Sequence, residues 1–146
     1  MKKPDRWCTI VPVKRLRWNM FKIFLIGIGG FFGSVARYLA SGLAQDISRS
    51  ATFPWGTLAV NVTGCLLIGF VSQLAESRGF LTDATRGLVI IGFLGGFTTF
   101  STFGNETFLL LRDGQPLLSF GNAAGHLFAC LAAVWVGRSL AFALWR

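Results

Sequence analysis

The sequence predicts an all-α membrane protein with four transmembrane helices, the third of which is broken. The first observation is composition: 53% of the 146 residues are hydrophobic, only 14% are charged, and the mean hydropathy is +0.58. A soluble domain carries about 25% charged residues. The second observation is four apolar stretches, each long enough for the roughly 20 residues that cross a bilayer. The third is a run of glycines and hydroxyl residues inside the third stretch.

A basic N-terminal extension, residues 1–19, is expected to precede a single small domain, residues 20–146. The extension holds six basic residues and one acidic residue of a chain with net charge +8. Attraction to an anionic membrane surface, at about 1 kcal/mol per basic residue, explains this run better than nucleic-acid binding, so no nucleic-acid partner is expected. The apolar run 24–44 is longer than the roughly 7–15 residues of a secretory signal and is interpreted as a retained span. Alternatively, translation starts at Met20 and the extension is untranslated or a disordered tail.

Residues 21–43 are expected to form the first span. Small residues on one of its faces would let helices approach closely in a membrane; these are Gly27, Gly29, Gly30, Gly33 and Ser34. Arg37 lies near the end of this span. Either its long stem reaches the membrane surface, or its charge attracts anions at the mouth of a pore.

The second span is expected at residues 55–74, after a polar loop at 45–54. Pro54 suits the first turn of a helix, and Trp55 suits the membrane interface. Asn61 lies in mid-span, where its amide must find partners. It either bonds across helices or lets its NH₂ group replace water around a passing anion, and we favour the second interpretation.

The third span, residues 88–111, follows a loop at 76–85 and contains the glycine-rich run. Backbone freed from a helix at membrane depth is tolerated only where it is buried in protein or lines a polar cavity. Gly95 and Thr98 flank the expected break, where glycine permits backbone angles that turn carbonyls outward as ligands for a hard cation. The alternative is close helix crossing at the glycine pair 95–96.

Aromatic and hydroxyl residues follow the expected break. Phe100 and Phe103 lie three apart, a spacing that alone indicates a packed core. Next to Ser101 and Thr102, however, the two phenylalanines suggest contact with an anion, because ring edges carry partial positive charge and hydroxyls donate hydrogen bonds. This combination suits a small, strongly hydrated anion. Glu106 is the only acidic residue deep in an apolar stretch and would be protonated, paired or part of a vestibule.

The fourth span is expected at residues 117–145, after a tight turn at 112–116. Asn122, His126 and Cys130 are spaced by four and share one helical face. We interpret His126 as a hydrogen-bonded packing residue rather than a proton carrier. The short loops favour antiparallel neighbours and therefore a four-helix bundle.

The three cysteines and the weak charge bias between the loops complete the pattern. Cys8, Cys65 and Cys130 show no metal-ligand spacing and are expected to be small buried residues. Basic residues from Met20 onward are nearly balanced between the two sides. Such a chain is able to insert in both orientations and pair with its inverted copy, whereas the basic extension favours a cytoplasmic N-terminus.

Three segments resemble the Fluc (CrcB) family of fluoride channels: the run at 95–103, the segment at 56–61 and the pattern from Gly29 to Leu39. The resemblance implies an antiparallel, dual-topology homodimer in the bacterial inner membrane that exports fluoride from the cytoplasm by passive diffusion. It implies a structural Na⁺ at the dimer centre, held by the carbonyls of Gly95 and Thr98. The fluoride pathway and its vestibules would then comprise Asn61, Phe100, Ser101, Thr102 and Phe103, with Arg37 and Glu106.

Two rival functions are weighed against this one. A proton-coupled small multidrug exporter also has four spans, but it requires a membrane carboxylate in the first span, and residues 21–43 contain none. A purely structural membrane protein would not need the hydroxyl and aromatic residues at a helix break. An enzyme is not expected, because no nucleophile–base pair is apparent.

Overall fold

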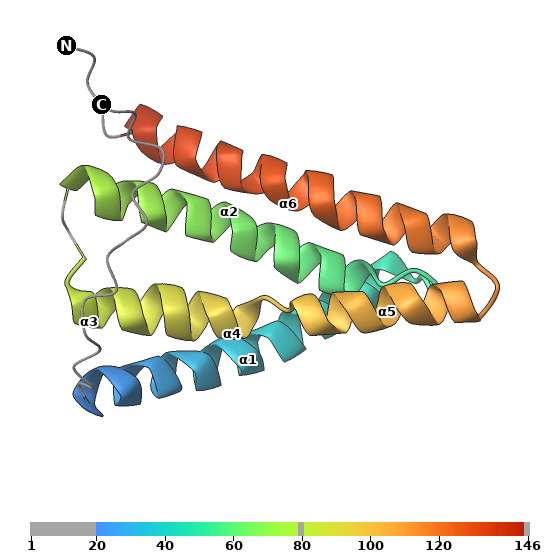
Figure 1. The fold of residues 1–146 in the computed structure, drawn as a ribbon, viewed down its shortest axis with the longest axis horizontal. Coiled ribbons are helices and arrows are strands. Elements are labelled where there is room, and N and C mark those ends of the chain that lie inside the picture. Colours follow the sequence, from blue (N-terminus) through green and yellow to red (C-terminus); the bar gives the residue numbers. More distant parts are fainter. Residues whose placement is uncertain (1–19, 79–80, 145–146) are drawn as a thin grey trace, which may run out of the picture.

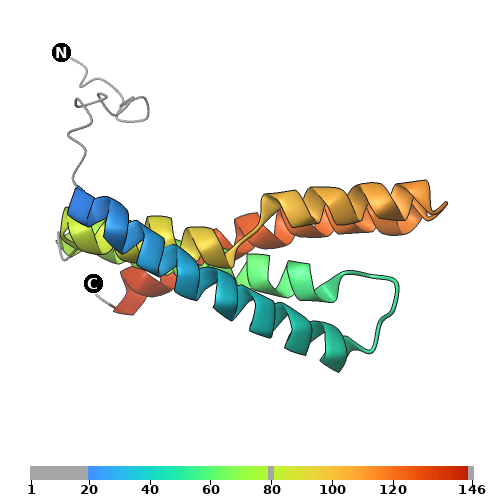
Figure 2. The ribbon, with the colours of Figure 1, turned by 90° about the horizontal axis from the view of Figure 1, so that it is seen from below.

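The computed structural model describes residues 20–78 and 81–144, and every regular secondary-structure element in this part of the chain is a helix (Figures 1 and 2). The elements are α1 (Met20–Ser48), α2 (Trp55–Arg78), α3 (Asp83–Arg86), η2 (Gly87–Leu94), α4 (Gly95–Phe97), α5 (Phe100–Arg112) and α6 (Pro116–Leu144). Four stretches are long and apolar enough to cross a membrane, namely Met20–Ser48, Trp55–Ser77, Asp83–Arg112 and Pro116–Leu144. The predicted all-α fold with four spans is confirmed. The basic extension 1–19 and the end of the fourth span lie outside the described residues.

The predicted ends of the first two spans are wrong by several residues. Helix α1 continues through residues 45–48, which were expected in the loop, and α2 continues past residue 74. Gln45 explains the first extension, since its Nε2 donates to the carbonyls of Ser50 and Phe53 and its Oε1 accepts from the N–H of Gly56 at 3.0 Å. One helical side chain thereby satisfies the loop backbone. Pro54 stands just before α2 rather than in its first turn.

Helices α2 and α6 lie side by side and run in the same direction (Figure 1). Glycines set their separation: a Cβ at Gly69 would collide with the backbone of Val134, and one at Gly137 with the carbonyl of Leu66. Contact of this kind requires glycine because no side chain fits between the backbones.

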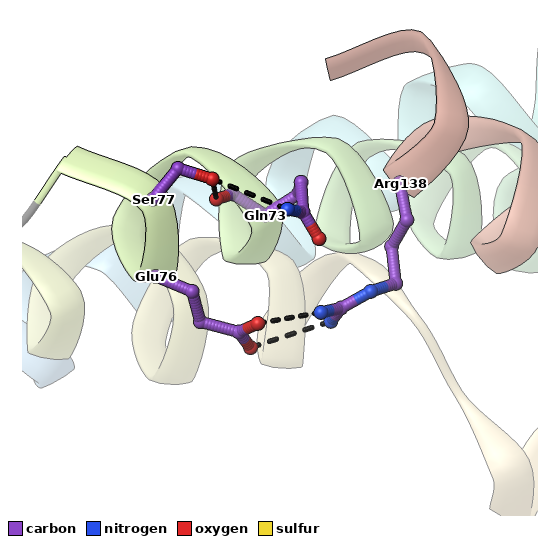
Figure 3. A network of polar contacts seen from close by, with 4 residues as sticks. All are labelled: Gln73, Glu76, Ser77 and Arg138. Atoms are coloured by element: carbon purple, nitrogen blue, oxygen red, sulfur yellow. Dashed lines mark hydrogen bonds and ion pairs between the residues drawn. The ribbon is translucent and has the colours of Figure 1, made fainter. Parts of the chain in front are cut away.

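A bidentate ion pair joins the same two helices near the end of α2 (Figure 3). The Arg138 guanidinium donates to both carboxylate oxygens of Glu76, with Nη2–Oε2 at 2.5 Å and Nη1–Oε1 at 3.3 Å. Beside it, Gln73 and Ser77 bond to each other within α2. Both charged side chains are substantially exposed, so the pair contributes little to stability, about 0–1 kcal/mol.

The third span is divided. Its first part is a π-helix, η2, followed by the single turn α4, and Thr98 and Thr99 then adopt extended angles (φ −95°, ψ 155° and φ −148°, ψ 116°) before α5 begins. The two parts have different neighbours: η2 and α4 pack on α1, whereas α5 packs on α6 (Figures 1 and 2). The π-helix was not predicted.

The turn before the fourth span has the predicted position. Gly114 has φ +74°, a left-handed conformation that favours glycine. The N–H of Gln115 donates to the carbonyl of Leu110 and that of Gly114 to the carbonyl of Leu111, which is the Schellman pattern for ending a helix. Pro116 then opens α6, where its missing N–H costs nothing.

Candidate ion pathway

Asn61 of α2 holds both backbone groups of Thr99, one of the two extended residues. Its Nδ2 donates to the Thr99 carbonyl at 3.0 Å, and its Oδ1 accepts from the Thr99 N–H at 2.8 Å. The side chain is buried, with 7% exposed. Of the two interpretations of Asn61, the cross-helix bond is therefore present. A primary amide has two N–H donors, and no hydrogen bond joins the second one to another described residue.

Hydroxyl groups gather at the start of α5. The Thr99 Oγ1 accepts from the N–H of Thr102 at 3.2 Å, as an N-cap residue does. The same oxygen lies 3.2 Å from the Oγ of Ser101 and 3.0 Å from the Oγ1 of Thr102. The side chains of Ser101 and Thr102 are exposed, so these rotatable donors are available on the surface of this chain.

An open cavity of about 400 Å³ lies between α2, the start of α5 and α6. The ring of Phe100 is largely exposed, and its centroid lies 5.3 Å from that of Phe103. Phe103 in turn contacts the imidazole of His126, with ring centroids 4.3 Å apart. The lining comprises Asn61, Cys65, Thr98, Thr99, Phe100, Phe103, Ala123, His126, Leu127, Cys130 and Leu131. Three of the five predicted pathway residues thus line one cavity, and Ser101 and Thr102 are not among the lining residues.

His126 lines the cavity, although the sequence predicted only a packing role for it. Its Nδ1 lies 3.0 Å from the carbonyl of Asn122, which confirms a hydrogen-bonded packing residue. Its Nε2 is buried and has no hydrogen-bond partner among the described residues. The four-residue spacing of Asn122, His126 and Cys130 was the available signal, since it places this imidazole on the face of α6 that packs against α2.

Side-chain hydrogen bonds attach α5 to α6. Ser119 donates from Oγ to the carbonyl of Thr107 at 2.8 Å, and Asn122 donates from Nδ2 to the Thr107 Oγ1 at 2.8 Å. Asn122 is completely buried. These bonds hold the aromatic residues of α5 beside the α6 wall of the cavity.

A second cavity, of about 430 Å³, lies between the α1–α2 loop and α5. Figure 2 shows the α1–α2 end of the bundle diverging from the α5–α6 end. Glu106 lines this cavity, and its Oε1 accepts from the Thr57 hydroxyl at 2.7 Å. Its Oε2 is buried without a partner among the described residues. Thr57 and Gln45 also line this cavity, and neither was identified from the sequence.

Arg37 stands apart from both cavities. Its side chain is half-buried on α1, and no hydrogen bond or ion pair joins it to another described residue. It lines neither cavity within one chain. The structure therefore does not bring Arg37 and Glu106 together in the protomer.

Gly95 and Thr98 lie on either side of the point where the α-helical part of the third span ends. In a continuous α-helix the N–H of Thr99 would bond to the carbonyl of Gly95, but here it donates to Asn61. Among the described residues, no hydrogen bond outside the helices ends on the carbonyl of Gly95 or Thr98. Gly95 is also exposed. Two carbonyl oxygens are thus available near the middle of the third span.

Comparison with known proteins places these features in a family. The family model described as "CrcB-like protein, Camphor Resistance (CrcB)" matches residues 24–138. A protein of Opitutus terrae named fluoride-specific ion channel FluC is 49% identical over 121 residues, which cover 82% of this chain and 91% of that protein.

Two other relatives carry the same name. That of Chlorobaculum tepidum is 48% identical over 127 residues, covering 87% of this chain and 98% of the relative. That of a Geobacter species is 42% identical over 125 residues, covering 86% and 100%. These relatives are named as ion channels, which are not enzymes, so the prediction of no enzymatic activity is confirmed. This chain is a multi-pass membrane protein that belongs to the CrcB family of FluC-type channels.

Proposed function

We propose that this chain is a fluoride channel that lets F⁻ leave the cytoplasm passively across the bacterial inner membrane. The observation that carries the proposal is the cavity that Asn61, Phe100 and Phe103 line together beside extended backbone. Its relatives carry the name of fluoride-specific channels. In acidic surroundings fluoride enters cells as neutral HF and ionises inside. The fluoride ion then accumulates because it does not cross the membrane as HF does. A passive anion pore lets this fluoride leave the cell without nucleotide or proton coupling.

The pathway must replace water around the anion. Moving a bare ion into an apolar medium costs tens of kcal/mol, yet binding must stay weak enough for release. Ring edges of Phe100 and Phe103 and the amide N–H of Asn61 supply partial positive charge without a full countercharge. Ser101 and Thr102 add hydroxyl donors from the exposed face of α5.

Arg37 and Glu106 serve as vestibule residues in this proposal. The cation of Arg37 would raise the local concentration of anions near one mouth of the pore. Glu106 lines the cavity at the other side of the broken span, where Thr57 holds one of its oxygens.

A second copy of the chain, inverted in the membrane, completes the assembly that we propose. Hydroxyl groups of Ser101 and Thr102 are exposed at a depth where lipid offers no hydrogen bonds. Covering these hydroxyl groups with an identical chain removes the free-energy cost of exposing them to lipid. The weak charge bias of the sequence permits both orientations.

The two copies would together hold a structural Na⁺ at the dimer centre. Hard cations prefer oxygen ligands, and the carbonyls of Gly95 and Thr98 lack hydrogen-bond partners in one chain. Two such pairs supply an oxygen set that a single chain does not. The ion would neutralise carbonyl dipoles brought together at the interface.

Fluoride efflux from liposomes tests the function. Purified protein should release F⁻ rapidly and Cl⁻ slowly, as measured with ion-selective electrodes. Phe100→Ile and Phe103→Ile should each reduce fluoride flux about 2- to 10-fold, since an aromatic edge contact contributes about 0.5–1.5 kcal/mol.

Phe108→Ile is the matched control, because this exposed phenylalanine is on the same helix and does not line the cavity. Equal flux in all three variants would reject the roles of Phe100 and Phe103. Export of a cationic dye against a proton gradient, with no fluoride release, would instead favour the multidrug exporter, which family membership does not support.

Replacing Na⁺ by a larger organic cation tests the metal. If Gly95 and Thr98 hold Na⁺, the exchange should shift the detergent-solubilised protein from dimer to monomer in light scattering and lower fluoride flux together. Unchanged dimer and unchanged flux would contradict a structural sodium ion.

A further inference from the structure

Cys65 of α2 and Cys130 of α6 form a pair of neighbouring thiols. The two side chains are close enough to interact with each other, and both are free cysteines. The register of the helices explains this placement. Gly69 contacts Val134, and because α2 and α6 run in the same direction (Figure 1), the residues one turn earlier on each helix are Cys65 and Cys130. The glycine contact therefore places Cys65 and Cys130 at matching positions on the two packed helices.

The thiol pair faces the candidate ion pathway. Both cysteines line the cavity of about 400 Å³ that Asn61 and Phe103 also line. One turn away on α6, the buried Nε2 of His126 has no partner among the described residues and lines the same cavity. The thiols thus border an open cavity rather than a closed core.

The number of ligands restricts the metal. Within the described residues no group of three or more His, Cys, Asp or Glu side chains is arranged to hold a metal ion. Two sulfur atoms do not complete the tetrahedral shell of Zn²⁺. They do suit soft monovalent cations of the Cu⁺ and Ag⁺ type, which favour thiolates and accept two ligands in a line.

We propose that Cys65 and Cys130 form a two-coordinate site for a soft monovalent cation, and that the bound ion closes the fluoride pathway. Two Ag⁺–S bonds form and two S–H bonds break, so Ag⁺ and two thiols give a bis-thiolate complex of charge −1 and two protons. No oxidation takes place. The second half of this proposal depends on the proposed channel function.

Charge explains the closure. The metal complex places a net negative charge on the wall of the cavity that Phe100 and Phe103 also line. In a low-dielectric pathway a fixed negative charge repels an incoming anion far more strongly than in water. The complex also occupies part of the space that the anion needs.

Silver binding to the reduced, purified protein tests the site without any transport measurement. A Cys8→Ser background removes the third cysteine, and Cys65→Ser and Cys130→Ser are made in it. After incubation with AgNO₃ in chloride-free buffer and desalting, elemental analysis should find one silver ion per Cys8→Ser chain. Each further substitution should weaken binding about 100-fold or more, since losing even an outer-shell partner of a metal costs about 10- to 100-fold. Equal silver content in all three proteins would overturn the site.

Fluoride efflux from liposomes tests the closure. Ag⁺ should abolish efflux through the Cys8→Ser protein. Each of the two further serine variants should show the same efflux with Ag⁺ as without it. Stoichiometric binding with undiminished efflux would overturn the closure while leaving the site intact. A protein that binds silver but passes no fluoride in its metal-free state would overturn the channel function instead, so the two failures are distinguishable. Size-exclusion profiles of the serine variants confirm that they remain folded.

Discussion

The two halves of the third span are held in place by different means. The first half, residues 87–97, packs backbone to backbone on α1, and a Cβ at Gly29 or Gly33 would collide with the carbonyl of Leu88 or Phe93. The second half, residues 100–112, is attached to α6 by hydrogen bonds from side chains. The glycine contacts pack the backbone of the first half directly against the backbone of α1, so that no side chain fits between them. Side-chain attachment leaves the hydroxyl groups of Ser101 and Thr102 and the ring of Phe100 in the second half exposed.

The change from one kind of packing to the other happens at Thr98 and Thr99. Asn61 makes the change possible, because a single amide replaces the two helical hydrogen bonds that Thr99 has lost. The junction, the first half and the second half therefore respond differently to mutation, and three substitutions test this order.

Asn61→Leu is expected to have the largest effect. It leaves the part-buried N–H and C=O of Thr99 without their partner, and each unpaired group costs up to about 1–3 kcal/mol. Asn61→Asp retains an acceptor for the N–H but loses the donor to the carbonyl, so its loss of stability should be smaller. Unfolding in detergent micelles, followed by circular dichroism, measures both. If Asn61→Leu is as stable as the wild type, Asn61 does not hold the junction.

Gly33→Ala should have the second largest effect, because it tests the backbone packing of the first half. The added methyl group meets the carbonyl of Phe93, and forcing extra volume into a packed site costs about 1–3 kcal/mol. Gly27→Ala is the matched control on the same helix, since no atom lies within 4 Å of its added Cβ. The control should be unchanged or slightly more stable, as alanine favours helix. Equal unfolding temperatures for the two variants would contradict tight packing at Gly33.

The sequence predicted those features that depend on local composition. Four spans follow from the length of the apolar stretches, and the turn at 112–116 follows from Gly114 and Pro116. The end of α1 was misplaced because polar residues in the sequence resemble a loop, whereas Gln45 bonds to the loop from within the helix.

Features that depend on distant partners were not predicted. The π-helix η2 is packed against the glycines of α1, and local sequence patterns carry no signal for that geometry. Thr57 pairs with Glu106 from 49 positions away, so neither residue alone indicates the contact. A bond across helices was one of the two interpretations of Asn61, but the sequence did not identify its partner, Thr99, which is 38 positions away.

Ser119→Ala should have the smallest effect and tests the side-chain attachment of the second half. It removes the hydrogen bond to the Thr107 carbonyl, and such interhelical bonds in membrane proteins contribute about 0.6 kcal/mol on average and about 1.7 kcal/mol at most. Ser139→Ala is the matched control on α6, because its hydroxyl bonds only to the carbonyl of Trp135 in its own helix. The same unfolding assay should separate the two variants by that small margin. A loss at Ser119 as large as that of Gly33→Ala would mean that the second half is as tightly packed as the first, and the contrast between the two halves would then be wrong.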